Sequence, residues 1–298
     1  MARILTGTCS WTDPALVASG WYPPGTASDA EARLRYYASR FPVVEVDSTY
    51  YALPGERSGR LWAERTPDGF VFDVKAFSLL TGHPTRASAL PRDLRPEPAG
   101  NRFLRPGSAP AEVLDELWRR FTGALAPLRE AGRLGAVLLQ FPPSLAPGPA
   151  GEAAVAAARG RCAGMRAAVE FRHPGWFAPD RLGRTLDLLR GIDAAFVAVD
   201  VAQGLPSSLP PVAAATSPEL SVVRLHGRSP HWGTGSKEDR FRHRYTDGEL
   251  AEWLPRVRAM ADGSAEVHVL FNNCCGDAAV AAAGAAQRLL SGEVPNSP

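Results

Sequence analysis

The stretch AAVEFRHPGW (residues 167–176) begins like a buried strand and then carries two opposite charges just before a turn. Glu170 and Arg172 are two residues apart, so in a strand both side chains point to the same side. An unpaired charge inside a protein core costs several kcal/mol. The two charges are therefore stable only if they belong to a larger polar group, to which neighbouring strands contribute.

Seven other short stretches are rich in valine, leucine and phenylalanine, as strands are. They are RILTGTCSW (3–11), VVEVDSTYY (43–51), FVFDVKA (70–76), GAVLLQFP (135–142), AAFVAVD (194–200), LSVVRLHG (220–227) and EVHVLFNN (266–273). Helical patterns occur at 28–41, 56–65, 109–131, 150–163, 178–190, 247–261 and 276–291, whereas LPPVAAATSP after the sixth strand marks a helix poorly. This alternation predicts an α/β fold, a single (β/α)8 TIM barrel with eight parallel strands, spanning residues 1–298.

Alternate residues of a barrel strand face the helices and the barrel axis in turn. One set is entirely apolar and is expected to face the helices: Val44, Val46, Phe72, Val74, Val137, Leu139, Val169, Phe171, Val197, Val199, Val223, Leu225, Val267, Val269 and Phe271. The opposite set is mostly charged and is expected to face the axis: Glu45, Asp47, Asp73, Lys75, Gln140, Glu170, Arg172, Asp200, Arg224, His226, His268 and Asn272. Most of this polar set lies near strand ends, where TIM-barrel enzymes carry their chemistry.

The composition narrows the class of protein. The chain has 298 residues, 45% of them apolar, and a net charge of +2, which gives no general attraction to nucleic acid or membranes. No apolar stretch is long enough for a signal peptide or a membrane span, and the four cysteines form no CxxC pair. We therefore expect a cytoplasmic protein with reduced cysteines, and the sequence leaves its oligomeric state open.

The polar set supplies candidates for catalysis. The expected catalytic residues are Glu45, Lys75, Glu170, Asp200 and His226. The carboxylates can act as general acid and base, and an inward-pointing lysine can form a Schiff base or hold a substrate anion. Two alternatives stay open: the charges can form a purely structural ion-pair network, and Lys75 can pair with Asp47 or Asp73.

Further residues at strand ends and in loops are expected to bind the substrate. They are Asp47, His83, Gln140, Arg172, Arg224, Arg228 and Asn272, together with the aromatic residues Trp11, Tyr50 and Trp176. Arginine forks around the GTG sequence at 233–235, after the seventh strand, suit an anion such as phosphate, although such charge runs are also common on flexible surfaces. The long loop at 77–108 is expected to act as a lid.

Metal chemistry has less support in the sequence. The carboxylates are suitable ligands for a hard divalent metal, but His226 is the one imidazole expected at a strand end of the mouth, so we assign no metal ligands and no cofactor. The chain also lacks the P-loop, GxGxxG, HExxH and nucleophile-elbow motifs. Nucleotide-binding, zinc-protease and serine-hydrolase functions are therefore poor candidates.

The order of these segments resembles that of the YecE-like family, also called domain of unknown function seventy-two. The matching pieces are GTCSW (7–11), WYP (21–23), YYA (36–38), FPVVEVDSTYY (41–51), TPDGFVFDVKA (66–76), GHP (82–84), LGAVLLQFPPS (134–144), VEFRHPGW (169–176), VRLHGR (223–228) and FNN (271–273). The resemblance implies a TIM barrel and carries over no catalytic assignment. Similar proteins have been related to metal-dependent endonuclease-like barrels.

These observations predict an enzyme that acts on an anionic, phosphorylated or sugar-like substrate at the C-terminal mouth of the barrel. It would be a hydrolase, with phosphoester hydrolysis as one candidate reaction, or a lyase or isomerase, using carboxylate acid/base chemistry. The alternative is a non-catalytic protein that binds nucleic acid or a phosphorylated ligand through the arginine-rich loop. A third interpretation gives the polar ring no role beyond holding the barrel together.

Overall fold

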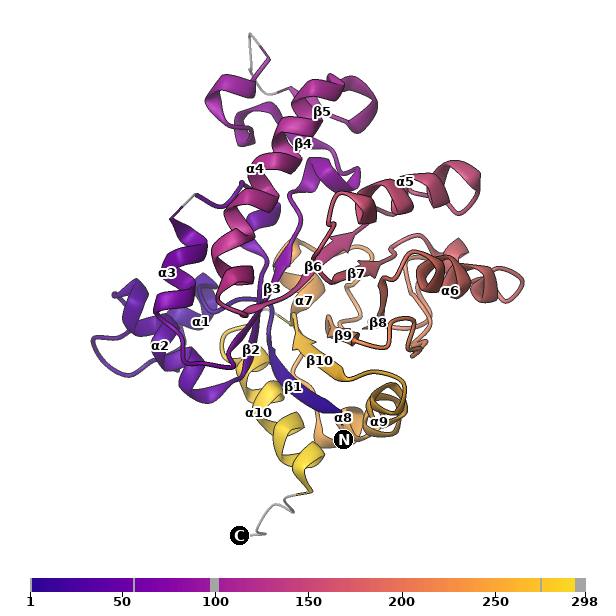
Figure 1. Ribbon diagram of the computed structural model, residues 1–298. Coiled ribbons are helices and arrows are strands. Elements are labelled where there is room, and N and C mark those ends of the chain that lie inside the picture. Colours follow the sequence, from indigo (N-terminus) through magenta and orange to yellow (C-terminus); the bar gives the residue numbers. More distant parts are fainter. Residues whose placement is uncertain (1, 56, 97–101, 274, 293–298) are drawn as a thin grey trace.

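Eight parallel strands close into a barrel in the order β1-β10-β9-β8-β7-β6-β3-β2. They are β1 (Arg3–Thr8), β2 (Val43–Val46), β3 (Val71–Lys75), β6 (Leu134–Gln140), β7 (Ala167–Glu170), β8 (Ala195–Asp200), β9 (Leu220–Leu225) and β10 (Glu266–Phe271). This computed structural model describes residues 2–55, 57–96, 102–273 and 275–292. Helices surround the strands (Figure 1), so the predicted TIM barrel is confirmed.

The surrounding helices agree in place with most of the predicted helical patterns. They are α1 (Pro14–Ala18), α2 (Ala30–Arg40), α3 (Ser58–Glu64), α4 (Ala111–Glu130), α5 (Pro149–Gly160), α6 (Leu182–Gly191), α7 (Lys237–Phe241), α8 (Asp247–Ala251), α9 (Leu254–Asp262) and α10 (Ala278–Ser291). Helix α4 buries Leu117, Phe121 and Leu128, which recur at helical spacing and form its core-facing stripe. The single helix expected at 247–261 is divided into α8 and α9, because Pro255 cannot continue a helix and instead opens the first turn of α9.

No helix lies between β8 and β9, a segment whose residues 201–219 are all described. Four prolines in this segment, at 206, 210, 211 and 218, oppose helix formation. Thr216 instead attaches the segment to the barrel: its hydroxyl donates to the Ala194 carbonyl at 2.6 Å and accepts from the Phe196 amide at 2.7 Å. An irregular segment thus occupies the position of one barrel helix.

Strand register shows which residues face the axis. In β8, Val199 pairs with Arg224 and therefore faces the axis, while Asp200 pairs with Leu225 and faces the helices. The prediction that Val197 and Val199 face outward and Asp200 faces inward is wrong. The error has a physical reason, because β8 is apolar on both faces and its pattern does not indicate which face is which.

The long loop after β3 forms an extension of the barrel. It contains a small antiparallel pair, β4 (Thr85–Arg86) and β5 (Phe103–Leu104), and the short 3-10 turns η2 (Ser78–Thr81), η3 (Ala87–Ala89), η4 (Arg92–Leu94) and η5 (Pro106–Ser108). The extension lies at the top of Figure 1, beside the start of α4. Its role as a lid stays a prediction.

Two further predictions concern membranes and cysteines. Within the described part of the chain, no helix combines the length and apolar character needed to cross a bilayer. Cys9, Cys162 and Cys275 take part in no disulfide among the described residues, and Cys274 lies outside them.

Candidate active site

Arg224 of β9 is the centre of an ionic cluster inside the barrel mouth. Its side chain is fully buried, and its Nε and Nη2 each donate to one oxygen of Glu45 from β2 at 2.7 Å. Its Nη1 donates to Glu170 of β7. Burial disfavours the charged guanidinium, but Glu170 and Glu45 outweigh this and hold the pKa of Arg224 well above its usual value. One arginine therefore joins carboxylates from two different strands.

The carboxylate of Glu170 has donors on both of its oxygens. It accepts from Gln140 Nε2 at 2.7 Å and pairs with Arg172 Nε at 2.5 Å, in addition to its bond from Arg224. Burial alone would raise its pKa, but Arg172, Arg224 and His226 hold the pKa of this carboxyl well below its usual value. Glu170 is fully buried, so it serves as a fixed counter-ion behind the cations that face the mouth.

His226 follows β9 and is held as a neutral imidazole. Arg172 Nη2 lies 2.9 Å from its Nε2, and the Asn272 amide lies 2.9 Å from its Nδ1. Burial and the adjacent Arg172 lower the pKa of His226 to about 3. It is fully buried, so its contact with Arg172 holds that guanidinium in place.

Lys75 ends β3 and differs from the arginines of the cluster in how it is held. Its Nζ lies 4.5 Å from the centre of the Tyr50 ring and makes no hydrogen bond or ion pair with any described residue. Burial, and then repulsion by Arg224, lower its pKa to about 8. The alternative in which Lys75 pairs with Asp47 or Asp73 is therefore not seen within the described part of the chain.

His83, from the long loop, closes one side of the same opening. Its ring packs edge-on against Tyr50, with ring centres 5.1 Å apart. The Thr81 hydroxyl, directed at the Ser78 carbonyl at 3.4 Å, lies 3.1 Å from His83 Nδ1. A hydroxyl can donate to Nδ1 or accept from it, so this contact fixes the position of the His83 ring and not its tautomer. Burial and the cations Lys75 and Arg172 lower the pKa of His83 to about 4, so it is neutral near pH 7.

Four of the predicted site residues lie away from the mouth. Asp200 accepts from Tyr245 at 2.7 Å and Trp253 at 3.0 Å, and it pairs with Arg228, which also pairs with Glu252. All of these contacts lie on the helix side of β8. Trp11 packs edge-on against Trp62 and Phe72, and Trp176 is fully buried on Phe171. Asp47, by contrast, follows β2 directly and lies near the mouth cluster: burial is the main cause that raises the pKa of Glu45, and the charge of Asp47 adds to it.

Two residues of the cluster were missed by the sequence reasoning. Cys9 Sγ lies 3.4 Å from Glu45 Oε2 and 3.6 Å from Arg224 Nη2. Its place was readable from the sequence, because Leu5, Gly7 and Cys9 share one side of the first strand. Trp232 lies under the Arg172 guanidinium, 5.6 Å from its ring centre, and no periodicity in that loop indicated it.

A second ionic cluster lies deeper in the barrel, toward the strand N-termini. His268 of β10 is fully buried between Asp73 Oδ2 at 2.7 Å and Glu266 Oε1 at 2.6 Å. Arg3 and Arg166 each pair with Glu266 at 3.3 Å. Burial opposes protonation, but the two carboxylates raise the pKa of His268 to about 9. The polar set expected to form one ring is thus divided between two levels.

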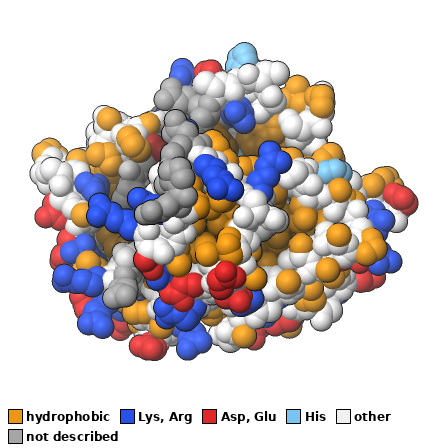
Figure 2. Space-filling model, turned by 90° about the horizontal axis from the view of Figure 1, so that it is seen from above, with side chains coloured by type: hydrophobic (Ala, Val, Ile, Leu, Met, Phe, Trp, Pro, Cys, Tyr) orange, Lys and Arg blue, Asp and Glu red, His pale blue; other side chains and the backbone are white. Residues whose placement is uncertain are grey.

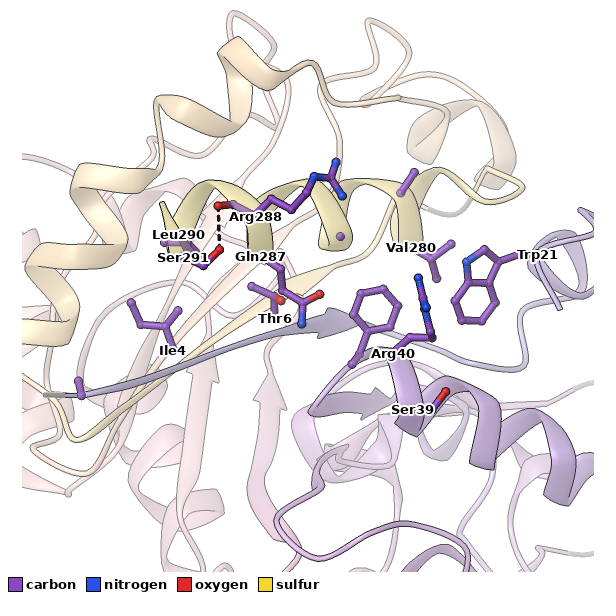
Figure 3. Close-up of a pocket in the computed structure, with 14 residues that line it drawn as sticks. Ile4, Thr6, Trp21, Ser39, Arg40, Val280, Gln287, Arg288, Leu290 and Ser291 are labelled. Atoms are coloured by element: carbon purple, nitrogen blue, oxygen red, sulfur yellow. Dashed lines mark hydrogen bonds between the residues drawn. The ribbon is translucent and has the colours of Figure 1, made fainter. Parts of the chain in front are cut away.

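A groove on the outer wall provides a contrast to the mouth. It has a volume of about 870 Å³ and lies between α2 and α10 over β1 (Figure 3). It contains Arg40 and Arg288, which form no ion pair with any described residue. Its cations stand at the ends of helices, where arginine is favoured without any ligand.

The groups left available at the mouth are donors. Lys75 Nζ and Arg172 Nη1 have no hydrogen-bond partner among the described residues, and both side chains are only partly buried, Arg172 with 15% exposure. The carboxylates Glu45 and Glu170 are fully buried behind them. No group of three or more His, Cys, Asp or Glu side chains suited to a metal ion was found in the described residues. In Figure 2, Lys and Arg side chains border a hollowed, largely hydrophobic area on the face that carries the β4–β5 extension.

The fold and this cluster define a TIM-barrel protein with an ionic, cation-lined C-terminal mouth. The chain belongs to the family described as "Protein of unknown function DUF72", whose model matches residues 5–298.

Three similar proteins match nearly the whole chain. The UPF0759 protein YunF of Bacillus subtilis (strain 168) is 30% identical over 279 residues, which are 92% of this chain and 89% of that protein. The crystal structure of the DUF72 family protein EF0366 of Enterococcus faecalis V583 has a TM-score of 0.78 at 25% identity. The match covers 98% of this chain and 96% of the EF0366 chain. The DUF72 family protein TM1631 of Thermotoga maritima MSB8 has a TM-score of 0.77 at 26% identity, covering 97% and 99%.

Proposed function

We propose that this protein is an enzyme that binds an anionic, phosphorylated or carboxylate-bearing substrate in the barrel mouth. The observation that carries the proposal is the arrangement of charge. Glu45 and Glu170 both form ion pairs with Arg224. Lys75 and Arg172, in contrast, each keep at the opening a hydrogen-bond donor that no described residue satisfies. A cation held in a poorly solvated site without a counter-ion is stabilised by an incoming anion.

The same arrangement favours a lyase or isomerase over carboxylate-catalysed hydrolysis. A general base must reach the proton it removes, and both carboxylates of the cluster are fully buried and already hydrogen-bonded. Asp200 is committed to Arg228, Tyr245 and Trp253. Lys75 and the neutral His83 are the groups at the opening that can accept or donate a proton.

The alternative of a binder that uses the arginine-rich loop has less support. Arg228 is paired with Asp200 and Glu252, Arg244 with Asp277, and Arg240 donates to the Gly235 carbonyl. Arg228 and Arg244 thus attach the loop to neighbouring elements, and Arg240 holds the loop's own backbone.

The test is a melting-temperature screen of small phosphates and carboxylates, followed by turnover assays of the stabilising compounds and their aldehyde, ketone and sugar derivatives. At ten times its Kd an anion contributes about 1.4 kcal/mol, which raises the Tm by roughly 2–4 °C. We expect this ligand-induced shift in the wild type, its loss in Lys75→Gln, and its reduction by added salt.

Arg40→Gln is the matched control, because it removes a cation from the outer groove instead of the mouth. An anion-induced shift that survives Lys75→Gln and disappears in Arg40→Gln would refute the site. Binding at the mouth with no turnover of any stabilising compound would replace the enzyme with a binding protein.

A further inference from the structure

We propose that Lys75 is a catalytic nucleophile that forms a Schiff base with an aldehyde or ketone carried by the anionic substrate. The inference deepens the proposed function and rests on it, because the anion site positions the carbonyl group. It narrows the substrate class from any small anion to carbonyl compounds that bear a phosphate or carboxylate.

The geometry around Lys75 suits a nucleophile better than a structural cation. A structural lysine is held by acceptors, whereas Lys75 Nζ has no hydrogen-bond or ion-pair partner among the described residues and rests on the Tyr50 ring at 4.5 Å. Arg224, behind it, already satisfies both Glu45 and Glu170. Burial and the nearby Arg224 and Arg172 favour loss of the proton from this amine, and the attraction of Glu45 and Glu170 offsets them only in part.

Arg172 and His83 complete what a Schiff-base site requires. Nη1 of Arg172, which no described residue satisfies, can hold the anionic group of the substrate, while the other nitrogens are fixed by Glu170 and His226. His83 is a neutral imidazole near pH 7, and its Nδ1 lies 3.1 Å from the Thr81 hydroxyl. The His83 ring contacts the Tyr50 ring, on which Lys75 Nζ also rests, so His83 lies near the reacting groups.

The reaction is balanced without any further reagent. The neutral amine of Lys75 adds to the carbonyl carbon, and the new N–C bond forms as the carbonyl π bond breaks to give a carbinolamine. His83 transfers one proton from the nitrogen to the oxygen to complete the carbinolamine. A second proton, equivalent to the one that the Lys75 ammonium released to solvent, is then delivered by His83 to the hydroxyl group, which leaves as water. The product is a protonated imine, an electron sink for cleavage or isomerisation at the adjacent carbon.

The use of lysine in this chain points the same way. Of 33 basic residues only two, Lys75 and Lys237, are lysines, so the chain meets almost every need for positive charge with arginine. Arginine would hold an anion at least as well in a bidentate geometry, but it does not form an imine. Lysine is the residue that the chemistry requires at this position.

The experiment is reductive trapping. The full-length protein is incubated at pH 7.5 with glyoxylate or pyridoxal 5′-phosphate, two anionic aldehydes of different size, and reduced with sodium cyanoborohydride. Mass spectrometry of the digested protein locates the adduct. We expect Lys75 to be modified at least about tenfold faster than Lys237, with a rate that rises through about pH 8. Inorganic phosphate should protect Lys75 in competition.

Two variants make the result specific. Lys75→Arg keeps the positive charge and should retain the phosphate-induced Tm shift while losing the trapped adduct, whereas Lys237→Arg should be trapped like the wild type. Equal rates at the two lysines, or no adduct at Lys75 with either aldehyde, would overturn the Schiff-base inference. If phosphate still stabilises the wild type in that case, the anion site stands; if phosphate has no effect on the wild type, the proposed function fails as well.

Discussion

Two ionic clusters lie inside one barrel, and they are built differently. In the deep cluster the cations all have carboxylate partners: His268 contacts Asp73 and Glu266, and Arg3 and Arg166 close it through Glu266. In the mouth cluster Arg224 is also fully paired, but Lys75 Nζ rests on the Tyr50 ring and has no hydrogen-bond or ion-pair partner among the described residues.

The difference separates charges that hold a fold together from charges that await a ligand. Buried ionic groups are tolerated when hydrogen bonds or ion pairs satisfy their polar atoms. In the deep cluster nearly all of the polar atoms have such a partner. Asp73 Oδ1 is its exception among the described atoms. An incompletely solvated cation without a counter-ion is instead a cost to stability that function can explain. Four predictions sharpen or break this contrast.

The largest effect is expected from Arg224→Met. The change leaves Glu45 buried without its bidentate partner and removes one partner of Glu170, so we expect a loss of about 3–5 kcal/mol in the free energy of unfolding. Urea denaturation measures it. Arg120→Met is the control, because its pairs with Asp93 and Glu116 lie at the surface and should contribute less than about 1 kcal/mol. Similar losses in the two variants would show that the mouth cluster is not what holds these strands together.

The deep cluster should make stability depend on pH. The pKa of His268 is raised from 6.5 to about 9 in the folded protein, so its stabilising contribution is complete below about pH 6.5 and is lost as the pH rises through about 9. The contribution is about 3 kcal/mol at most. Denaturation at pH 6 and pH 9.5 should show this loss in the wild type, and His268→Gln should remove most of the difference. An unchanged pH dependence in the variant would contradict the arrangement.

Gly135→Ala tests how closely the deep cluster is packed. A Cβ at this position would overlap Asp73 Oδ1 and Val71 Cγ1 and approach His268 Cε1, so we expect a loss of roughly 2 kcal/mol. Gly123→Ala in α4 is the matched control: a Cβ there would meet no described atom within 4 Å, and helix propensity favours alanine by up to about 1 kcal/mol. A Gly135→Ala variant as stable as the wild type would mean that the deep cluster is loosely packed at this position.

The smallest effect, and one of opposite sign, is expected at the mouth. Because folding lowers the pKa of Lys75 from 10.5 to about 8, its charge opposes folding below pH 8, and this penalty disappears as the pH rises above 10.5. Lys75→Gln should therefore stabilise the protein by roughly 1 kcal/mol at pH 7, less than full burial would give because solvent still reaches the side chain. A destabilised variant would show that Lys75 has a structural role.

The sequence predicted the barrel and most of the mouth cluster because both follow from simple periodicities. Strands such as β2, β3 and β7 alternate between apolar and charged residues, so the faces that carry Glu45, Lys75 and Glu170 were readable. Asp200 was misplaced because β8 is apolar on both faces. The division of the polar set into two levels, and the contact of Trp232 with Arg172, depend on strand stagger and loop path, which residue spacing does not encode.

The most direct test of the contrast between the two clusters is the titration of the lysines themselves. With ¹³C-labelled lysine the protein should show only two side-chain NMR signals, assigned with Lys237→Arg. We expect the Lys75 signal to titrate near pH 8 and to move to higher pH when phosphate is added, because an anion in the mouth stabilises the ammonium form. A Lys75 signal that titrates near 10.5 and ignores phosphate would contradict the account.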